Sequence, residues 1–428
     1  MTVLLANLPA ELMLLLYRSL ENIDDVYHLA RSCRRLHDIL EAGRNRLVIM
    51  RSVILNSEIH KYDVRLCRFI DVNQAHASAI TEAADRTTGR PDSSVFKACY
   101  STECRNISDE HVWEIVCRWQ GLRLIQDLYL HPIIQQAYSD SMFPYDVHTL
   151  VDTLKLTEET PVPALKDCLI SSKQRSFNSE QTGRFYAATT AHWLAIEALR
   201  LAHASTYHLS TERNTRYSQI HHMWKDNEEM SLQESFDVLE VYDFIYGYLL
   251  RKVMGTGNWY LQWSPGDVPY PRWSDMNLFV NNARLHLRPP DIIELLLMHT
   301  WTDEPGWPED KGQYLASRGM FDFYGGSVRH MDTPFLPDTY FSGGHLEVGV
   351  GLKLEAYGGE ELSRGWASYR KEWPVEARHS LFWWATSDEK IAERIREYRG
   401  REGFPDRVPG FPHLSRRALL EGEVEPYN

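Results

Sequence analysis

Four side chains of the types that bind zinc lie between positions 99 and 117. Cys99, Cys104, His111 and Cys117 are separated by four, six and five residues. The set lacks the tight two-residue cysteine knuckle that is common in zinc domains, and Cys117 falls on a predicted helix. Buried or free thiols are therefore the favoured interpretation, and a zinc site is the alternative.

Short motifs that carry common enzyme chemistry do not occur in the chain. The sequence has no His-Glu-x-x-His pair, no Gly-x-Ser-x-Gly nucleophile turn and no phosphate loop ending in Lys-Ser or Lys-Thr. His192 and Glu197 are five residues apart, as are His203 and His208, so on a helix the members of each pair diverge by about 140°. The sequence thus predicts no catalytic residue, no metal and no cofactor, and we expect a protein that is not an enzyme.

Tryptophans gather in the C-terminal part of the chain. Nine of the thirteen lie from Trp259 to Trp384, several of them in segments rich in Gly and Pro at 257–275 and 301–308. Tryptophan combines a large rigid surface with a polar N–H and is favoured in recognition sites. Packing on the helical core is one interpretation, and a shared exposed groove is the other. The candidate target-binding residues are Trp259, Trp263, Trp273 and Trp307.

Charge and hydropathy argue against nucleic-acid and membrane partners. The 46 Lys and Arg against 59 Asp and Glu give a net charge of −13, which disfavours binding to a phosphate backbone. Arginines between Arg31 and Arg51 form a local basic cluster, which we interpret as a solvated or partner-facing side. No apolar run approaches the roughly 20 residues that cross a bilayer, and the N-terminus lacks a basic signal region. We expect a soluble protein of the cytoplasm or nucleus with reduced cysteines.

Helical periodicity dominates the elements that position these side chains. Pro9 suits the first turn of a helix that continues with Leu12, Leu15, Leu16 and Leu20 on one face, which Tyr17 widens. A second helix, capped by Asp24 or Asp25, is predicted to run to Leu40, and a third follows from residue 47 to residue 59. Three short helices are therefore expected in the first sixty residues.

Further helices are predicted over most of the remaining chain. Their expected ranges are 108–131, 183–204, 232–254 with a capping box at Ser231 and Glu234, 289–299, and one that opens at Ser387 or Asp388. A short strand is predicted at 345–354, and a weak connector near 84–95. The predicted fold class is mainly α with at most a minor β element: a three-helix unit at 1–62 and a large irregular helical domain at 63–428, rich in aromatic loops over 257–428.

One segment of the N-terminal unit resembles a known family. Leu8-Pro9-Ala10-Glu11-Leu12, the bulky pair Leu16-Tyr17, Asp25-Val26, Leu29-Ala30 and Cys33-Arg34-Arg35-Leu36 resemble an F-box, and more narrowly the F-box variants of filamentous-fungal proteins. The resemblance covers residues 6 to about 50.

The F-box resemblance implies a function in ubiquitin ligation. It implies that the N-terminal helices dock on the Skp-type adaptor of a cullin ubiquitin ligase, while the rest of the chain selects an unidentified protein target. The adaptor contacts that it implies are Leu8, Pro9, Leu12, Leu16, Val26 and Leu29. Three alternatives stay open: helices that only cap the next domain, an enzyme or ligand binder with a pocket beside the aromatic loops, and a scaffold that self-associates through the Leu12 face.

Overall fold

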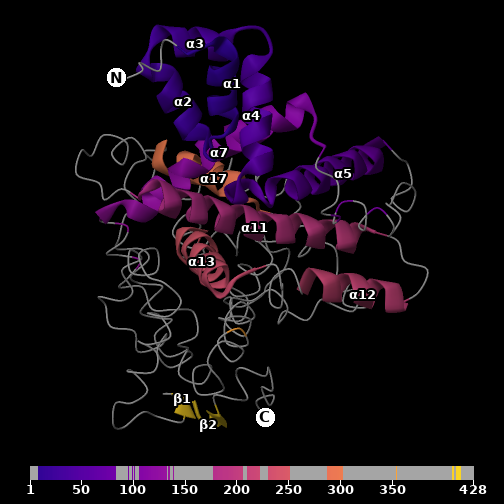
Figure 1. The fold of residues 1–428 in the computed structure, drawn as a ribbon. Coiled ribbons are helices and arrows are strands. Elements are labelled where there is room, and N and C mark those ends of the chain that lie inside the picture. Colours follow the sequence, from indigo (N-terminus) through magenta and orange to yellow (C-terminus); the bar gives the residue numbers. More distant parts are fainter. Residues whose placement is uncertain are drawn as a thin grey trace. The chain divides into compact units, whose positions relative to one another are not determined.

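A computed structural model describes the chain in several stretches (Figure 1). They are 8–82, 106–132, 177–205, 210–221, 230–250, 287–301, 407–408 and 411–415, together with single residues near 95–101, at 134 and 138, and Lys353. The chain divides into two compact units, Met1–Leu124 with Asn178–Arg213, and Ile125–Phe177 with Asn214–Asn428. The predicted boundary at residue 62 lies inside the first unit. The predicted connector near 84–95 lies outside the described residues except for Val95, which is helical.

The N-terminal segment folds into four helices instead of the predicted three. These are α1 (Ala10–Arg18), α2 (Ile23–Ser32), α3 (Arg34–Glu41) and α4 (Asn45–Asn56). The predicted second helix is broken at Cys33, whose backbone is extended with φ −159° and ψ 155°. Its cap is Asn22, whose side chain accepts a hydrogen bond of 2.8 Å from the Asp24 amide, so neither Asp24 nor Asp25 is the capping residue.

Helix α1 packs against α3 and α4, and α2 packs against the same two helices (Figure 1). The core side of α1 is formed by Met13 and Tyr17, which are 1% and 0% exposed. Tyr17 belongs to the predicted apolar face, but Met13 does not, and Leu12 and Leu15 of that face are exposed. The Tyr17 hydroxyl donates a buried hydrogen bond of 3.0 Å to the carbonyl of Leu36 in α3.

Long helices complete the first unit. After the short 3₁₀ helix η2 (Glu58–His60) come α5 (Asp63–Glu82), α7 (Asp109–Leu130) and α11 (Ser179–Ala204), with α11 packed along α5 and η2. The last residues of α7, 125–130, are assigned to the second unit. The predicted cap of α7 is confirmed, since the Ser108 hydroxyl accepts a hydrogen bond of 3.1 Å from the His111 amide. Helix α11 begins before the predicted residue 183, because Asn178 and Gln181 form a capping box there.

The second unit contains the capping box that the sequence predicts. Helix α13 (Leu232–Tyr242) starts where Ser231 donates its amide to Glu234 Oε2 at 2.8 Å, and Ser231 Oγ accepts the Glu234 amide at 3.2 Å. The helix continues as a π-helical segment, η4 (Asp243–Leu249). Helix α17 (Pro289–Trp301) begins at the predicted proline pair and contacts η4.

One further helix and a small β element involve this unit. Helix α12 (Ser210–His221) spans the division between the units. Strands β1 (Arg407–Val408) and β2 (Phe411–Ser415) pair antiparallel, with Val408 opposite Phe411. Lys353 is helical, so the predicted strand at 345–354 does not extend through it, and the helix predicted from Ser387 or Asp388 lies outside the described residues. The mainly α fold class is confirmed, and none of the described helices is long and apolar enough to cross a membrane.

Candidate functional site

Helix α1 carries apolar side chains on two sides. Leu12 and Leu15 are 48% and 59% exposed, whereas Met13 and Tyr17 are buried. At 100° per residue the midpoint of the exposed pair lies about 150° around the helix from the midpoint of the buried pair. Leu16 falls between the two directions and is half-buried. The core therefore leaves one apolar side of α1 in contact with solvent.

The predicted adaptor contacts fall into three classes of burial. Pro9 and Leu12 are exposed, and Leu8, Leu16 and Leu29 are half-buried. Val26 is 0% exposed and belongs to the core, so it is removed from the candidate docking residues. Leu29 lies on α2, whereas the other predicted contacts that remain lie in or immediately before α1.

Leu15 is not among the adaptor contacts that the resemblance implies, although it is more exposed than Leu12. The signal was present, because Leu15 follows Leu12 by three residues and therefore shares its side of a helix. We define the docking face as Pro9, Leu12, Leu15 and Leu16.

The other predicted site residues are only partly described. Trp259, Trp263, Trp273 and Trp307 lie outside the described residues, as does Cys104. Cys99 and Cys117 are free thiols, and burial raises the pKa of Cys99 to about 11. The His111 ring contacts Asp71 at 2.7 Å. Within the described stretches no group of three or more His, Cys, Asp or Glu side chains is arranged to hold a metal ion.

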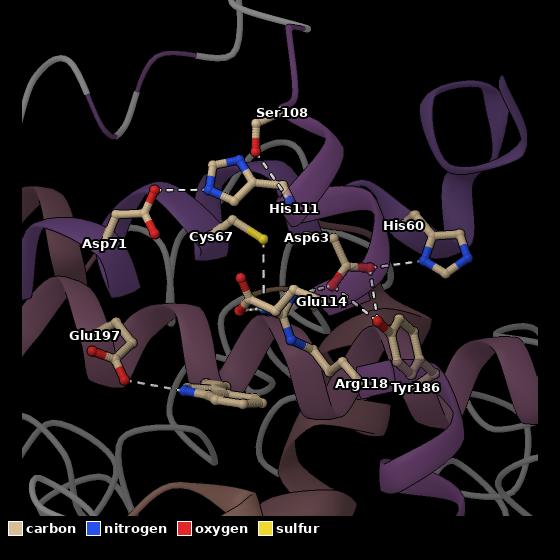
Figure 2. Close-up of polar contacts among 11 residues, drawn as sticks. His60, Asp63, Cys67, Asp71, Ser108, His111, Glu114, Arg118, Tyr186 and Glu197 are labelled. Carbon is tan, nitrogen blue, oxygen red and sulfur yellow. Dashed lines mark hydrogen bonds and ion pairs between the residues drawn. The ribbon is translucent and has the colours of Figure 1, made fainter. Parts of the chain in front are cut away.

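A buried polar cluster, not predicted from the sequence, joins four elements of the first unit. Figure 2 shows Asp63 of α5 facing His60 of η2, Arg118 of α7 and Tyr186 of α11. Asp63 Oδ2 lies 2.8 Å from His60 Nδ1, and Asp63 Oδ1 accepts from Arg118 Nη1 at 2.5 Å. The Tyr186 hydroxyl lies 2.9 Å from both carboxylate oxygens. Arg118 also donates to Glu114 at 2.6 Å. We call these five residues the Asp63 cluster.

Electrostatics within the Asp63 cluster favour the ionised pair. Burial by itself raises the pKa of Asp63, but the hydrogen bond from His60 and the charge of Arg118 outweigh burial and hold that pKa below its ordinary value. Burial alone would lower the pKa of Arg118, and the neighbouring Asp63 raises it above its ordinary value. The pKa of the Cys67 thiol beside Arg118 is raised to about 12 by burial.

Aromatic rings surround the Asp63 cluster. The His60 ring lies edge-on to Trp119 and Tyr186, with centroids 5.6 Å and 5.3 Å away. The Arg118 guanidinium lies over the ring of Trp193 at 5.1 Å. Because Asp63 and Arg118 are buried, hydrogen-bonded to each other and close to aromatic rings, we interpret this arrangement as one that holds the four elements together.

A second set of polar contacts ties the N-terminal helices to α7 and α11. Asp24 of α2 accepts from Trp119 Nε1 at 3.0 Å and pairs with Arg123. Asn22 donates to the Ser179 hydroxyl at the start of α11 at 3.1 Å. The helices that carry the docking face are therefore an integral part of the first unit.

The arginines of the basic cluster between Arg31 and Arg51 differ in their surroundings. Arg44 and Arg51 both pair with Asp109 at the start of α7. Arg46 lies over the rings of Tyr27 and Trp113, at 5.7 Å and 5.2 Å. Arg44, just before α4, and the α4 residues Arg46 and Arg51 thus contact neighbouring helices. The three arginines at the α2–α3 junction, Arg31, Arg34 and Arg35, are exposed.

Comparisons with protein-family models, curated proteins and solved structures found no match to this chain.

Proposed function

We propose that this chain is a non-enzymatic substrate receptor of a cullin ubiquitin ligase. In this proposal the docking face binds a Skp-type adaptor, and the rest of the chain selects a protein target for ubiquitination. The exposure of Leu12 and Leu15 is the observation that carries the proposal. Leu12 is the last residue of the Leu-Pro-x-Glu-Leu motif that resembles the start of an F-box, and Leu15 follows it in α1.

The energetics of the docking face fit a binding role. Fully burying a leucine side chain contributes roughly 1.5–3 kcal/mol, and about half of each side chain remains to be covered, so Leu12 and Leu15 together supply about 2 kcal/mol. That corresponds to about a thirtyfold change in affinity. Since Met13 and Tyr17 already hold α1 in the core, a partner covers the docking face without rearranging that core.

The roles proposed for the remaining chain follow from the same assignment. The tryptophans Trp259, Trp263, Trp273 and Trp307 stay the predicted target-binding residues. A cytoplasmic or nuclear location accords with an adaptor of the ubiquitin system, and the net charge of −13 accords with a protein target in preference to nucleic acid.

Calorimetric titration of the full chain with a recombinant Skp-type adaptor tests the proposal. We expect a 1:1 complex whose affinity falls about thirtyfold in the double variant Leu12→Ala/Leu15→Ala. The matched control is Leu12→Met/Leu15→Met, which keeps the apolar volume, and Leu, Met and Ala all favour helix, so α1 persists in each protein.

Two outcomes would defeat the receptor assignment. One is the absence of binding by a folded wild-type chain. The other is an affinity that the alanine variant leaves unchanged. If size-exclusion chromatography instead shows dimers that the alanine variant dissociates, the docking face serves self-association.

A further inference from the structure

The composition of α1 leaves its rotation weakly specified by hydrophobic burial. Its sequence, Ala-Glu-Leu-Met-Leu-Leu-Leu-Tyr-Arg, contains an unbroken apolar run from Leu12 to Leu16. Hydrophobic burial is non-directional and roughly proportional to area. A roll of the helix that buries Leu12 or Leu15 in place of Met13 would therefore exchange similar apolar areas. The exposed charges of Glu11 and Arg18 oppose a roll toward their own side of α1. Among the remaining orientations, a directional contact must make the selection.

Tyr17 supplies a directional contact at the C-terminal end of α1. Its side chain is 0% exposed, and its hydroxyl donates to the Leu36 carbonyl at 3.0 Å. Leu36 is 1% exposed and belongs to α3, so the acceptor sits in the core of the N-terminal helices. Hydrogen bonds depend strongly on distance and angle, and this one is satisfied at one rotation of α1.

A second hydrogen bond between α1 and a neighbouring helix is weaker. Ser52 of α4 donates to the Arg18 carbonyl at 3.3 Å in an exposed position, where water competes for the same groups. The buried Tyr17 bond is thus the stronger of the two restraints. A phenylalanine at this position would fill the same space but would leave the rotation to apolar contacts and the weaker Ser52 bond.

We propose that Tyr17 is a positioning residue for the docking face: its hydroxyl, bonded to the Leu36 carbonyl, fixes the rotation of α1 that keeps Leu12 and Leu15 in solvent. The assignment of a docking role to this face rests on the proposed function. The effect on α1 itself does not depend on any partner.

The test compares Tyr17→Phe with the matched control Tyr186→Phe in the full chain. Both changes remove one buried, hydrogen-bonded hydroxyl from the same unit and keep the ring. Tyr186 belongs to the Asp63 cluster in α11 and is not part of the docking face. The control therefore reports the consequence of lost stability without a direct change at α1.

The first readout is amide hydrogen exchange of the free protein, with exchange of the α1 amides expressed relative to that of the α4 amides. Loss of one ordinary net hydrogen bond predicts a rise of about three- to tenfold in this ratio for Tyr17→Phe. For Tyr186→Phe we expect the ratio to stay at the wild-type value. An unchanged ratio in Tyr17→Phe would overturn the proposal whether or not the adaptor binds.

The second readout is the affinity for the Skp-type adaptor, measured well below the melting temperature. We expect a loss of about three- to tenfold for Tyr17→Phe and wild-type affinity for Tyr186→Phe, because only the first change lowers the fraction of molecules with α1 correctly rotated. If both variants lose the same amount of affinity, Tyr17 stabilises the fold in general and does not position the docking face. If α1 exchange rises in Tyr17→Phe but the wild-type chain does not bind the adaptor, the receptor function fails while the positioning role stands.

Discussion

Replacing Arg118 with methionine would remove the cation that neutralises Asp63 inside the first unit. The side chain of Arg118 is 3% exposed and that of Asp63 is 0% exposed, so neither group has access to bulk water. His60 and Tyr186 would still donate to the carboxylate, but its negative charge would lose its cationic partner. Breaking one member of a buried ion pair costs about 3–5 kcal/mol. A typical domain has 5–15 kcal/mol of unfolding free energy, so the loss is a large share of the total.

Urea denaturation followed by tryptophan fluorescence measures this loss, because Trp119 and Trp193 lie beside the Asp63 cluster. The decisive comparison is a double-mutant cycle of Arg118→Met, Asp63→Asn and the two combined. We expect each single change to lower the unfolding free energy by about 3 kcal/mol or more. The double variant should recover about 2 kcal/mol relative to the sum, because it leaves no unpaired charge.

Additive single effects, or single effects below about 1 kcal/mol, would refute the reasoning. They would mean that the carboxylate and the guanidinium do not depend on each other. The Asp63 cluster would then not be what holds η2, α5, α7 and α11 together.

Three other outcomes are expected. The pKa of Asp63 is lowered in the folded state, so the carboxylate contributes its full stabilisation above the unfolded pKa of about 3.9. That stabilisation is lost as the pH falls through the folded pKa. When unfolding is measured as a function of pH, the unfolding free energy should therefore fall less steeply with acid in Asp63→Asn than in wild type. Met13→Ala should cost about 2–4 kcal/mol in thermal unfolding, whereas Leu12→Ala should cost less than about 1 kcal/mol, and equal costs would contradict the assigned rotation of α1. A fragment of residues 1–62 should show little helical circular dichroism, because Asp24 and His60 lose their partners in α5, α7 and α11. A fragment that is helical and melts cooperatively would contradict this expectation.

Local signals in the sequence were sufficient to predict several element boundaries. Three helix starts were predicted by residues that act within one helical turn: Ser108, the Ser231 and Glu234 capping box, and the proline pair before Asp291. Such signals can be recognised in a few consecutive residues. Helices α7 and α13 followed from periodicity in the same way. Such features depend little on the rest of the fold.

Features set by distant contacts were not predictable from the sequence. The break at Cys33 carries no glycine or proline, and it allows α2 and α3 to pack on each other and on α4. The rotation of α1 is hidden by the continuous apolar run from Leu12 to Leu16. The Asp63 cluster draws on residues as far apart as His60 and Tyr186. Only the spacings of His60 with Asp63 and of Glu114 with Arg118 gave a local hint.

The most direct test of the receptor function is the affinity of the full chain for a purified Skp-type adaptor, measured for wild type, Leu12→Ala/Leu15→Ala and Leu12→Met/Leu15→Met. A 1:1 complex that weakens about thirtyfold in the alanine variant and only a few-fold in the methionine variant is the predicted result. A folded wild-type chain that does not bind the adaptor, or one whose binding is indifferent to the alanine changes, would contradict the proposed function.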